Sequence, residues 1–207
     1  MLLKSPSFSG KDTVKIAKFL IGKILVRKIK TPAGKSKIIY ALITETEAYD
    51  GFSDKASHAS RGKTLRNTPM FAQAGSWYIY FVYGNHFMLN LVTGPKNYPA
   101  AVLIRGIKII PKNSNFIYPV KLLLYSTGIN FSTFYSISGP GRLTKFLKIN
   151  KNLNSQPANK NSGLWIEDYR VKITQKEIEK LPRVGVNYAG PIWSKKPWRF
   201  RLKQIII

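Results

Sequence analysis

Acidic residues are scarce in this chain of 207 residues, which has nine Asp and Glu against 34 Lys and Arg and a formal net charge of +25. So large a positive surplus exceeds what solubility requires and indicates a partner that carries many negative charges. Nucleic acid is the partner that fits this charge best. Because carboxylates are so few, each residue that could perform acid–base chemistry can be considered on its own.

Cysteine is absent, and His58 and His86 are the only histidines. Without cysteine the chain can have no disulfide, no thiolate nucleophile and no Cys-ligated zinc, which excludes the zinc deaminases. The small number of histidines also disfavours a histidine-rich metal site, although Asp and Glu could still hold magnesium. The chemistry that remains open is that of carboxylates.

Long apolar runs are missing too, since no stretch approaches the roughly 18 consecutive apolar residues of a membrane-spanning helix. The first residues, Met1 to Pro6, lack the apolar region of a secretory signal. A basic protein on a membrane surface is an alternative, but no long amphipathic helix with lysines on one face is visible. We expect a cytoplasmic protein with no membrane partner, associated with the nucleoid if the source is bacterial.

Apolar and β-branched residues predict one short helix and then a series of strands. Asp12 or Thr13 can cap a helix whose apolar stripe is formed by Ala17, Leu20, Ile21 and Ile24. Strands are predicted over residues 23–29, 38–46, 77–83, 86–92 and 100–110. With 44% apolar residues, the chain can form one core.

Turns between these strands place several candidate functional residues. Thr31-Pro32-Ala33-Gly34 reads as a hairpin turn, and the strand after it would end with Glu45 and Glu47. Gly84-Asn85 predicts a second hairpin with Tyr83 at its tip. An aromatic ring at a turn is hard to bury, so Tyr83 is a candidate for contact with a partner.

The second half of the chain has a weaker pattern. Residues 111–137 predict at most a weak helix near 120–125, and residues 148–163 read as a surface loop. Ser138-Gly139-Pro140-Gly141 resembles a loop that opens a short helix, with backbone amides open to a phosphate. Apolar and basic residues alternate in 183–207, which predicts an edge strand. We predict an α+β fold, a single domain over residues 1–207 built on a curved antiparallel β-sheet with flanking helices and a protruding β-hairpin.

Glu45 and Glu47 are the carboxylates with the most specific placement. Two positions apart on a strand, they would face the same side with Cα atoms roughly 6.6 Å apart. They could be the acid and the base of a sugar hydrolase, where carboxylates about 6.5–9.5 Å apart suit inversion. Alternatively, one is paired with an arginine and the other is a general base that activates water. Both could also be ordinary ion-pair partners.

Aromatic residues are concentrated in residues 71–87, where seven of the seventeen residues are Phe, Trp or Tyr. Aromatic rings stack on nucleobases, with about 1–3 kcal/mol per base, but they are also common in cores. The residues expected in the core share one strand face: Trp77, Ile79 and Phe81. Tyr78 and Tyr80 share the opposite face near the carboxylates, where contact with a base is the better interpretation.

These residues belong to a series of short motifs along the chain: Glu45-Thr46-Glu47-Ala48-Tyr49, His58, Arg66-Asn67, Met70-Phe71, Trp77 to Gly84, Asn90 and Arg105. The series continues with Ser138-Gly139-Pro140, Leu143, Arg183-Val184-Gly185-Val186, Lys196-Pro197 and Arg199-Phe200. The whole series, in this order, resembles the alkyladenine DNA glycosylase family, also called 3-methyladenine DNA glycosylases. The likeness extends from Gly22 to Phe200 and is specific because the motifs occur together.

The resemblance implies a reaction and its catalytic residues. A DNA repair glycosylase of this family flips an alkylated purine of the 3-methyladenine class out of duplex DNA and hydrolyses its N-glycosidic bond, leaving an abasic site. Glu47 stands at the position of the base that deprotonates the attacking water. Arg105 stands where an arginine orients this water and the nearby phosphate. The family requires no metal, no other cofactor and no Schiff-base lysine, so we expect a monofunctional enzyme without a cofactor.

The resemblance also implies how the base is bound. Tyr49, His58 and Tyr80 stand where the family sandwiches and contacts the extruded base. Asn90 matches a residue that crowds the exocyclic amine of guanine, and Tyr83 matches the wedge that intercalates into the stack. Tyrosine faces would add cation–π attraction for cationic lesions such as 3-methyladenine. The expected partner is double-stranded DNA with alkylated or deaminated purines, bound by a monomer.

The chain departs from the family in residues 111–135, which lack its arginine-rich helix, and His86 has no implied role. A non-catalytic RNA- or DNA-binding structural protein is the main alternative, because it explains the charge equally well. Such a protein needs no carboxylate in an aromatic pocket. A glycoside hydrolase explains the acid pair but gains nothing from a strongly positive surface.

Overall fold

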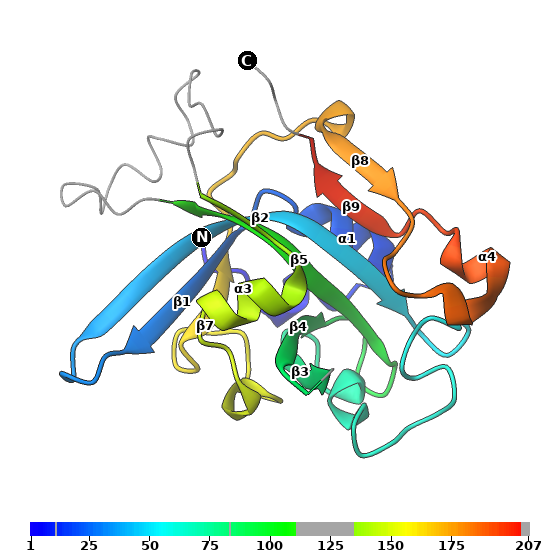
Figure 1. Cartoon of the computed structure of the whole chain (residues 1–207), viewed down its shortest axis with the longest axis horizontal. Coiled ribbons are helices and arrows are strands. Elements are labelled where there is room, and N and C mark those ends of the chain that lie inside the picture. Colours follow the sequence, from blue (N-terminus) through cyan, green and yellow to red (C-terminus); the bar gives the residue numbers. More distant parts are fainter. Residues whose placement is uncertain (11, 83, 111–134, 204–207) are drawn as a thin grey trace.

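The computed structural model describes residues 1–10, 12–82, 84–110 and 135–203, which form one antiparallel sheet with short helices packed on it (Figure 1). The strands are β1 (Ile24–Lys30), β2 (Ser36–Asp50), β3 (Trp77–Val82), β4 (His86–Val92), β5 (Ala100–Ile110), β6 (Ser136–Ser138), β7 (Leu164–Glu167), β8 (Ile178–Leu181) and β9 (Arg199–Leu202). The α-helices are α1 (Thr13–Leu20), α3 (Pro140–Phe146) and α4 (Gly190–Ser194). The 3-10 helices are η1 (Ser5–Ser7), η2 (Thr68–Phe71), η4 (Lys151–Leu153), η5 (Gln175–Glu177) and η6 (Asn187–Ala189).

β2 and β5 are the central pair of the nine-stranded sheet. β1 pairs with the first half of β2 and is followed by β7, whereas β9 pairs with residues 45–47 of β2 and is followed by β8. On the other side of the pair, β4 and then β3 extend the sheet from the first residues of β5, and β6 pairs further along β5. The second half of β2, which carries Glu47 and Tyr49, therefore lies between β5 and β9.

A β-bulge interrupts β2 at Glu45, where the register with β5 shifts on both sides of this residue. Bulges bend a strand and re-aim its side chains, and they are common beside active sites. The partner of Glu45 on β5 is Gly106, where an added Cβ would lie 2.9 Å from the Glu45 Cβ. The bulge therefore requires the glycine.

The strand predicted to end with Glu45 and Glu47 is longer than expected. β2 continues to Asp50 because its last residues stay paired with β5, from Glu47 opposite Leu103 to Asp50 opposite Ala100. Both glutamates thus lie inside a paired strand. Their side chains are almost completely buried.

α1 packs on the sheet through an apolar stripe, and Asp12 caps it as predicted by accepting a hydrogen bond from the Lys15 N–H at 2.9 Å. Its buried residues are Thr13, Ile16, Ala17 and Leu20. Thr46 on β2 donates its hydroxyl to the Ala17 carbonyl at 2.8 Å. The prediction that Ile24 belongs to the helix is wrong: the chain turns at Gly22, whose φ is +83°, and Ile24 begins β1.

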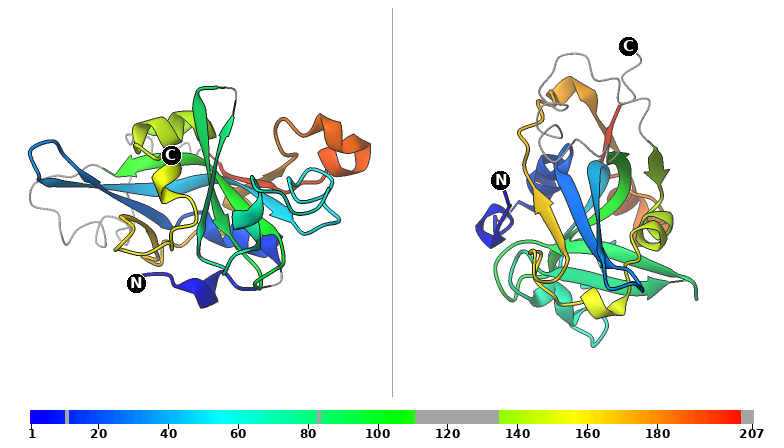
Figure 2. Two further views of the ribbon diagram at one scale, coloured as in Figure 1. Left: turned by 90° about the horizontal axis from the view of Figure 1, so that it is seen from below. Right: turned by 90° about the vertical axis from the view of Figure 1, so that its left-hand side faces the viewer.

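β3 and β4 form a hairpin that stands out from the sheet (Figure 2). Trp77 and Ile79 are buried as predicted, but Phe81 is 48% exposed. The reason is that β5 pairs with β4 only at residues 90–92, so none of the described strands lies beside the outer part of the hairpin. Tyr83, the predicted wedge, lies outside the described residues.

The predicted fold class is confirmed, since the sheet is antiparallel and curved, with flanking helices and a protruding hairpin. The prediction of an edge strand in 183–207 is wrong. In the described part of this segment, up to residue 203, the one strand is β9, and it pairs on both sides, with β2 and β8. The sequence did not predict β6, β7 and β8, because strands of three or four residues are too short to show a period. The weak helix near 120–125 lies outside the described residues.

Candidate active site

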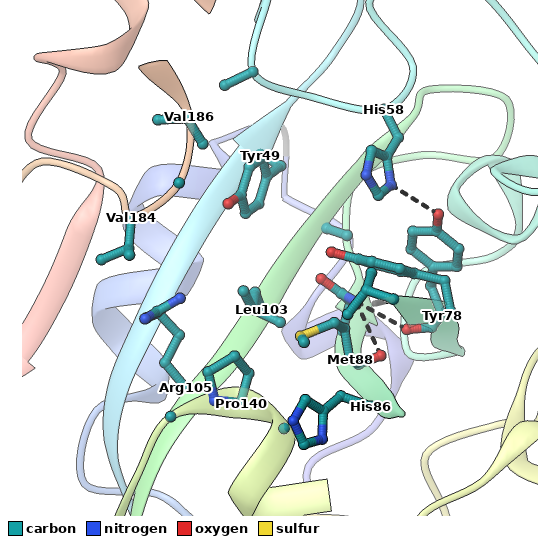
Figure 3. Close-up of a pocket in the computed structure, with 18 of the residues that line it drawn as sticks. Tyr49, His58, Tyr78, His86, Met88, Leu103, Arg105, Pro140, Val184 and Val186 are labelled. Carbon is teal, nitrogen blue, oxygen red and sulfur yellow. Dashed lines mark hydrogen bonds between the residues drawn. The ribbon is translucent and has the colours of Figure 1, made fainter. Parts of the chain in front are cut away.

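A cavity of about 440 Å³ lies between the β3–β4 hairpin, the start of α3 and the segment that joins β8 to η6. Its volume falls in the range of ligand pockets, about 300–1,000 Å³. Figure 3 shows Tyr49, Arg105 and Val184 on one side of the cavity and His58 and Tyr78 on the other. The cavity therefore combines a side next to the carboxylates with an aromatic side.

Most of the predicted site residues meet at this cavity. Those that line it are Tyr49, His58, Tyr80, Asn90 and Arg105. Glu47 does not line it: the side chain is fully buried and touches three residues that do, Tyr49, Arg105 and Val184. Tyr83 is outside the described residues, so its predicted role stays a prediction.

His58, Tyr78 and Tyr80 form the aromatic side of the cavity. The His58 Nδ1 atom lies 3.1 Å from the Tyr78 hydroxyl, and the rings of His58 and Tyr80 meet at a steep angle with centroids 4.6 Å apart. Asn67 fixes the loop by donating to the His58 carbonyl at 2.9 Å. Burial, assisted by the Arg66 charge, lowers the pKa of His58, so its ring is neutral near neutral pH. A neutral aromatic wall suits stacking on a planar base.

Two hydrogen-bond donors and one arginine cation hold the Glu47 carboxylate. The Tyr49 hydroxyl donates to Oε2 at 2.8 Å, and the Val184 backbone N–H donates to Oε1 at 2.8 Å. The Arg105 Nε atom lies 3.4 Å from Oε1. Burial raises the pKa of Glu47, although Arg105, the Val184 N–H, the Tyr49 hydroxyl and Arg199 oppose the rise. A buried carboxylate with a raised pKa, held directly behind the residues that line a cavity, is a candidate general base.

Glu45 has a different environment from Glu47. Its Oε1 atom accepts hydrogen bonds from Arg199 Nη1 at 3.0 Å and from Arg105 Nε at 3.2 Å. Glu45 does not line the cavity, and the shared Arg105 lies against both carboxylates. Of the alternatives that the sequence leaves open, this arrangement favours a structural ion pair at Glu45 and a separate base at Glu47.

Residues 7–205 match the model of the methylpurine-DNA glycosylase (MPG) family. The chain belongs to this family. A protein of Psychrobacter cryohalolentis is 38% identical over 197 residues, which cover 95% of this chain and 89% of the relative. A protein of Methanocella arvoryzae is 40% identical over 194 residues, covering 93% and 88%. One of Sodalis glossinidius is 36% identical over 197 residues, covering 95% of both chains. All three carry the provisional name 3-methyladenine DNA glycosylase.

Family membership confirms the resemblance seen in the sequence motifs and makes this chain a DNA glycosylase of DNA repair, with DNA as its substrate.

In this glycosylase Asn90 is buried, and its Nδ2 donates to the backbone carbonyls of Tyr78 at 3.1 Å and Met88 at 3.4 Å. The amide is thereby fixed in one orientation.

Several residues that line the glycosylase cavity had no predicted role: His86, Val184 and Tyr188. Val184 belongs to the Arg183-Val184-Gly185-Val186 motif, so that motif could have located it. His86 packs against α3, where a Cβ added at Gly141 would lie 2.7 Å from its Cγ. Tyr188 is 68% exposed and donates its hydroxyl to the Ala56 carbonyl at 2.9 Å. No sequence pattern marks His86 or Tyr188.

All nine acidic residues of the glycosylase have partners within the protein. Those in ion pairs are Asp12, Glu45, Glu47, Asp54, Asp168 and Glu179. The other three, Asp50, Glu167 and Glu177, accept hydrogen bonds and form no ion pair with another described residue. So few acids neutralise a minor part of the positive charge, and the surplus is left for an external partner such as the phosphates of DNA.

Within the described ranges no group of three or more His, Asp or Glu residues could hold a metal ion. Over the same residues, no helix is long and apolar enough to cross a membrane.

Proposed function

We propose that this protein flips an alkylated purine of the 3-methyladenine class out of duplex DNA and hydrolyses its N-glycosidic bond with a water activated by Glu47. One observation carries the proposal: Glu47 is a fully buried carboxylate, and its two hydrogen-bond donors and its ion-pair partner Arg105 all line a cavity whose opposite side is aromatic. The carboxylate thus lies one contact away from a space that can accept a base. The product is an abasic site in an intact strand.

The reaction needs little from the protein beyond orientation and one base. Glu47 takes a proton from water, the oxygen bonds to C1′, and the bond from C1′ to the purine nitrogen breaks. An alkylated purine that is already cationic leaves as a neutral base. Arg105 orients the water and an adjacent phosphate. The cavity lining includes no lysine among the described residues, which supports hydrolysis over a Schiff-base step and a monofunctional enzyme.

The lesion is selected by extrusion and then by the cavity. A damaged base costs less to unstack than a normal one, which is a first source of selectivity. Tyr49 and Tyr80 then offer ring faces to a cationic base. Asn90 crowds the exocyclic amine of guanine and so rejects it. Deaminated purines such as hypoxanthine lack that amine and are a second class of substrate that this geometry admits.

The enzyme is proposed to act as a monomer, with residues 1–207 forming a single DNA glycosylase domain. In a bacterial cell the substrate would place the protein at the nucleoid.

The test compares Glu47→Gln with Glu45→Gln, a matched change two positions away on the same strand. Both variants are assayed for single-turnover excision from duplexes with one defined lesion, and for binding to an uncleavable abasic analogue. Glu47→Gln is expected to lose a factor of about 10² to 10⁴ in rate, as for loss of a general base, with affinity kept or increased. Glu45→Gln should cost stability or a modest part of the rate. Near wild-type rates for Glu47→Gln would remove it from this role.

A further inference from the structure

Arg183 and Asp54 form a buried ion pair just outside the cavity. The side chains of both are 0% exposed, and neither lines the cavity. Arg183 Nη1 donates to Asp54 Oδ2 at 2.5 Å and Nη2 donates to Oδ1 at 2.8 Å, which makes the pair bidentate. The proposed mechanism assigns no role to Arg183 or Asp54.

This pair is not explained by stability alone. Desolvation of two charges offsets most of their attraction, so a buried ion pair is weak support for the folded state. In addition, the Nε atom of Arg183 is buried and has no hydrogen-bond partner among the described residues. A buried donor without a partner is costly, so its presence needs an explanation, and a functional role is one.

Arg183 contacts the residues on the C-terminal side of Glu47 in β2. Its Nη1 atom donates to the Ala48 carbonyl at 2.8 Å. Its guanidinium lies 4.9 Å from the ring centre of Tyr49 and 5.0 Å from that of Trp198, between the two rings. The Tyr49 ring therefore packs against a fixed cation on one side, while its hydroxyl is held at Glu47.

The backbone beyond Arg183 completes the arrangement. The next residue is Val184, whose N–H donates to Glu47 Oε1. Asp54 extends the network to the loop that carries His58, because its carboxylate also accepts hydrogen bonds from the backbone N–H groups of Asp50 at 3.2 Å and of Ala56 at 3.1 Å. One ion pair thus ties β2, the loop that carries His58 and the segment that carries Val184.

We infer that Arg183 is a positioning residue for the general base: together with Asp54 it fixes Tyr49 and the Val184 N–H, the two donors that orient the Glu47 carboxylate by hydrogen bonds. The inference rests on the proposed role of Glu47. The planar fork of arginine is what the site requires, because a lysine ammonium could keep the charge but could not serve Asp54, Ala48 and two ring faces at once.

If the pair were purely structural, breaking it would lower stability and leave the chemistry of the folded enzyme unchanged. The measurement must therefore report on Glu47. The acid side of the pH profile of excision provides it. The Tyr49 hydroxyl and the Val184 N–H both lower the pKa of Glu47, so weakening them raises this pKa and moves the acid midpoint to higher pH. The variants leave unchanged the charged and titratable groups that face Glu47: Glu45 and Tyr49 on β2, Tyr80 on β3, Arg105 on β5 and Arg199 on β9.

The experiment uses the full chain with Arg183→Lys and with Asp54→Asn. Single-turnover excision is measured across pH, together with binding to a duplex that carries an abasic analogue. We expect a folded Arg183→Lys protein that binds nearly as well as the wild type and excises roughly 10- to 100-fold more slowly, the scale for a misplaced catalytic group. Its acid midpoint should lie at higher pH. Asp54→Asn should move both quantities in the same direction.

The control variant is Asp168→Asn, which breaks the Lys23–Asp168 pair at 3.0 Å, away from the cavity. It should lower stability without moving the midpoint. Wild-type rate and midpoint in folded Arg183→Lys, or failure of both pair variants to fold, would overturn the inference. Glu47→Gln is run in parallel: if it stays active the proposed function fails, whereas an inactive Glu47→Gln beside an unaffected Arg183→Lys rejects only the positioning role.

Discussion

Tyr49 donates its hydroxyl proton to Glu47, two positions away on β2, across 2.8 Å. Neighbours at this spacing share a strand face, so the bond joins a residue that lines the cavity to the buried carboxylate behind it. Burial, together with the negative charge of Glu47, raises the pKa of Tyr49 well above its usual value, and the phenol therefore remains a donor at neutral pH. A ring that lines the cavity thus also holds the carboxylate that we propose as the general base.

Tyr49→Phe separates these roles, because it keeps the ring and removes the donor. Without the hydroxyl the pKa of Glu47 rises further, so excision should fall at the acid end and recover at higher pH, where the ionised base is stronger. At neutral pH the loss should stay below the factor of about 10² to 10⁴ expected for loss of the base itself. Single-turnover rates across pH test this prediction, and an acid midpoint equal to that of the wild type contradicts it.

Glu47→Gln should make the folded protein more stable at neutral pH. Burial raises the folded pKa of Glu47 above its unfolded value. The contribution of Glu47 to stability is therefore fully present below the unfolded pKa and is lost as the pH rises through the folded pKa. A glutamine at position 47 stays neutral at every pH, so the variant does not lose stability in this way. Urea unfolding at neutral pH should favour the variant, with a smaller difference near the usual glutamate pKa of about 4.3. Equal stability at both pH values would contradict this account.

The sequence predicted the parts of the fold that have a long period or a clear turn. The strand over 100–110 and the hairpin turn at 31–34 are found where alternation and turn residues placed them. The bulge at Glu45 could not be predicted from the sequence pattern. It depends on pairing with Gly106 and with β9, a strand of four residues more than 150 positions away. Short strands such as β9 form because they pair with strands that are distant in the sequence.

In the candidate site, too, the residues in local motifs could be predicted, whereas the contacts between distant residues could not. Glu47 and Tyr49 could be selected from the sequence because they lie in one short motif and the acids are few, and Arg105 could be selected through the family resemblance. The Asp54–Arg183 pair could not be selected, since its partners are separated by 129 positions and only the fold brings them together. Nor could the sequence show that Glu47 is shielded from the cavity by the residues that bind it.

Asn90→Ser should relax the discrimination against guanine. Specificity that depends on an obstacle is lost when the obstacle is removed. Since the Asn90 amide is held by the carbonyls of Tyr78 and Met88, it cannot rotate away from a bound guanine without losing two hydrogen bonds. We expect slow guanine release to increase, with no gain in excision of 3-methyladenine. If guanine release stays at the wild-type level in an active Asn90→Ser protein, discrimination lies elsewhere in the cavity.

The charge of this glycosylase predicts a steep dependence of DNA binding on salt. Since its acids are engaged internally, the surplus cations are expected to contact phosphates, and log K should fall with log salt at a slope of about −0.9 per phosphate contacted. Arg142, exposed beside the cavity at the start of α3, is a candidate contact, whereas Lys35 is exposed in the β1–β2 turn, beyond the end of β2 remote from Glu47. Arg142→Gln should therefore reduce the slope by about one, while Lys35→Gln, which removes the same charge, should leave it unchanged. Filter binding to undamaged duplex over a range of salt measures both slopes. Equal reductions in the two variants would show that net charge, rather than a docking face around the cavity, determines the binding.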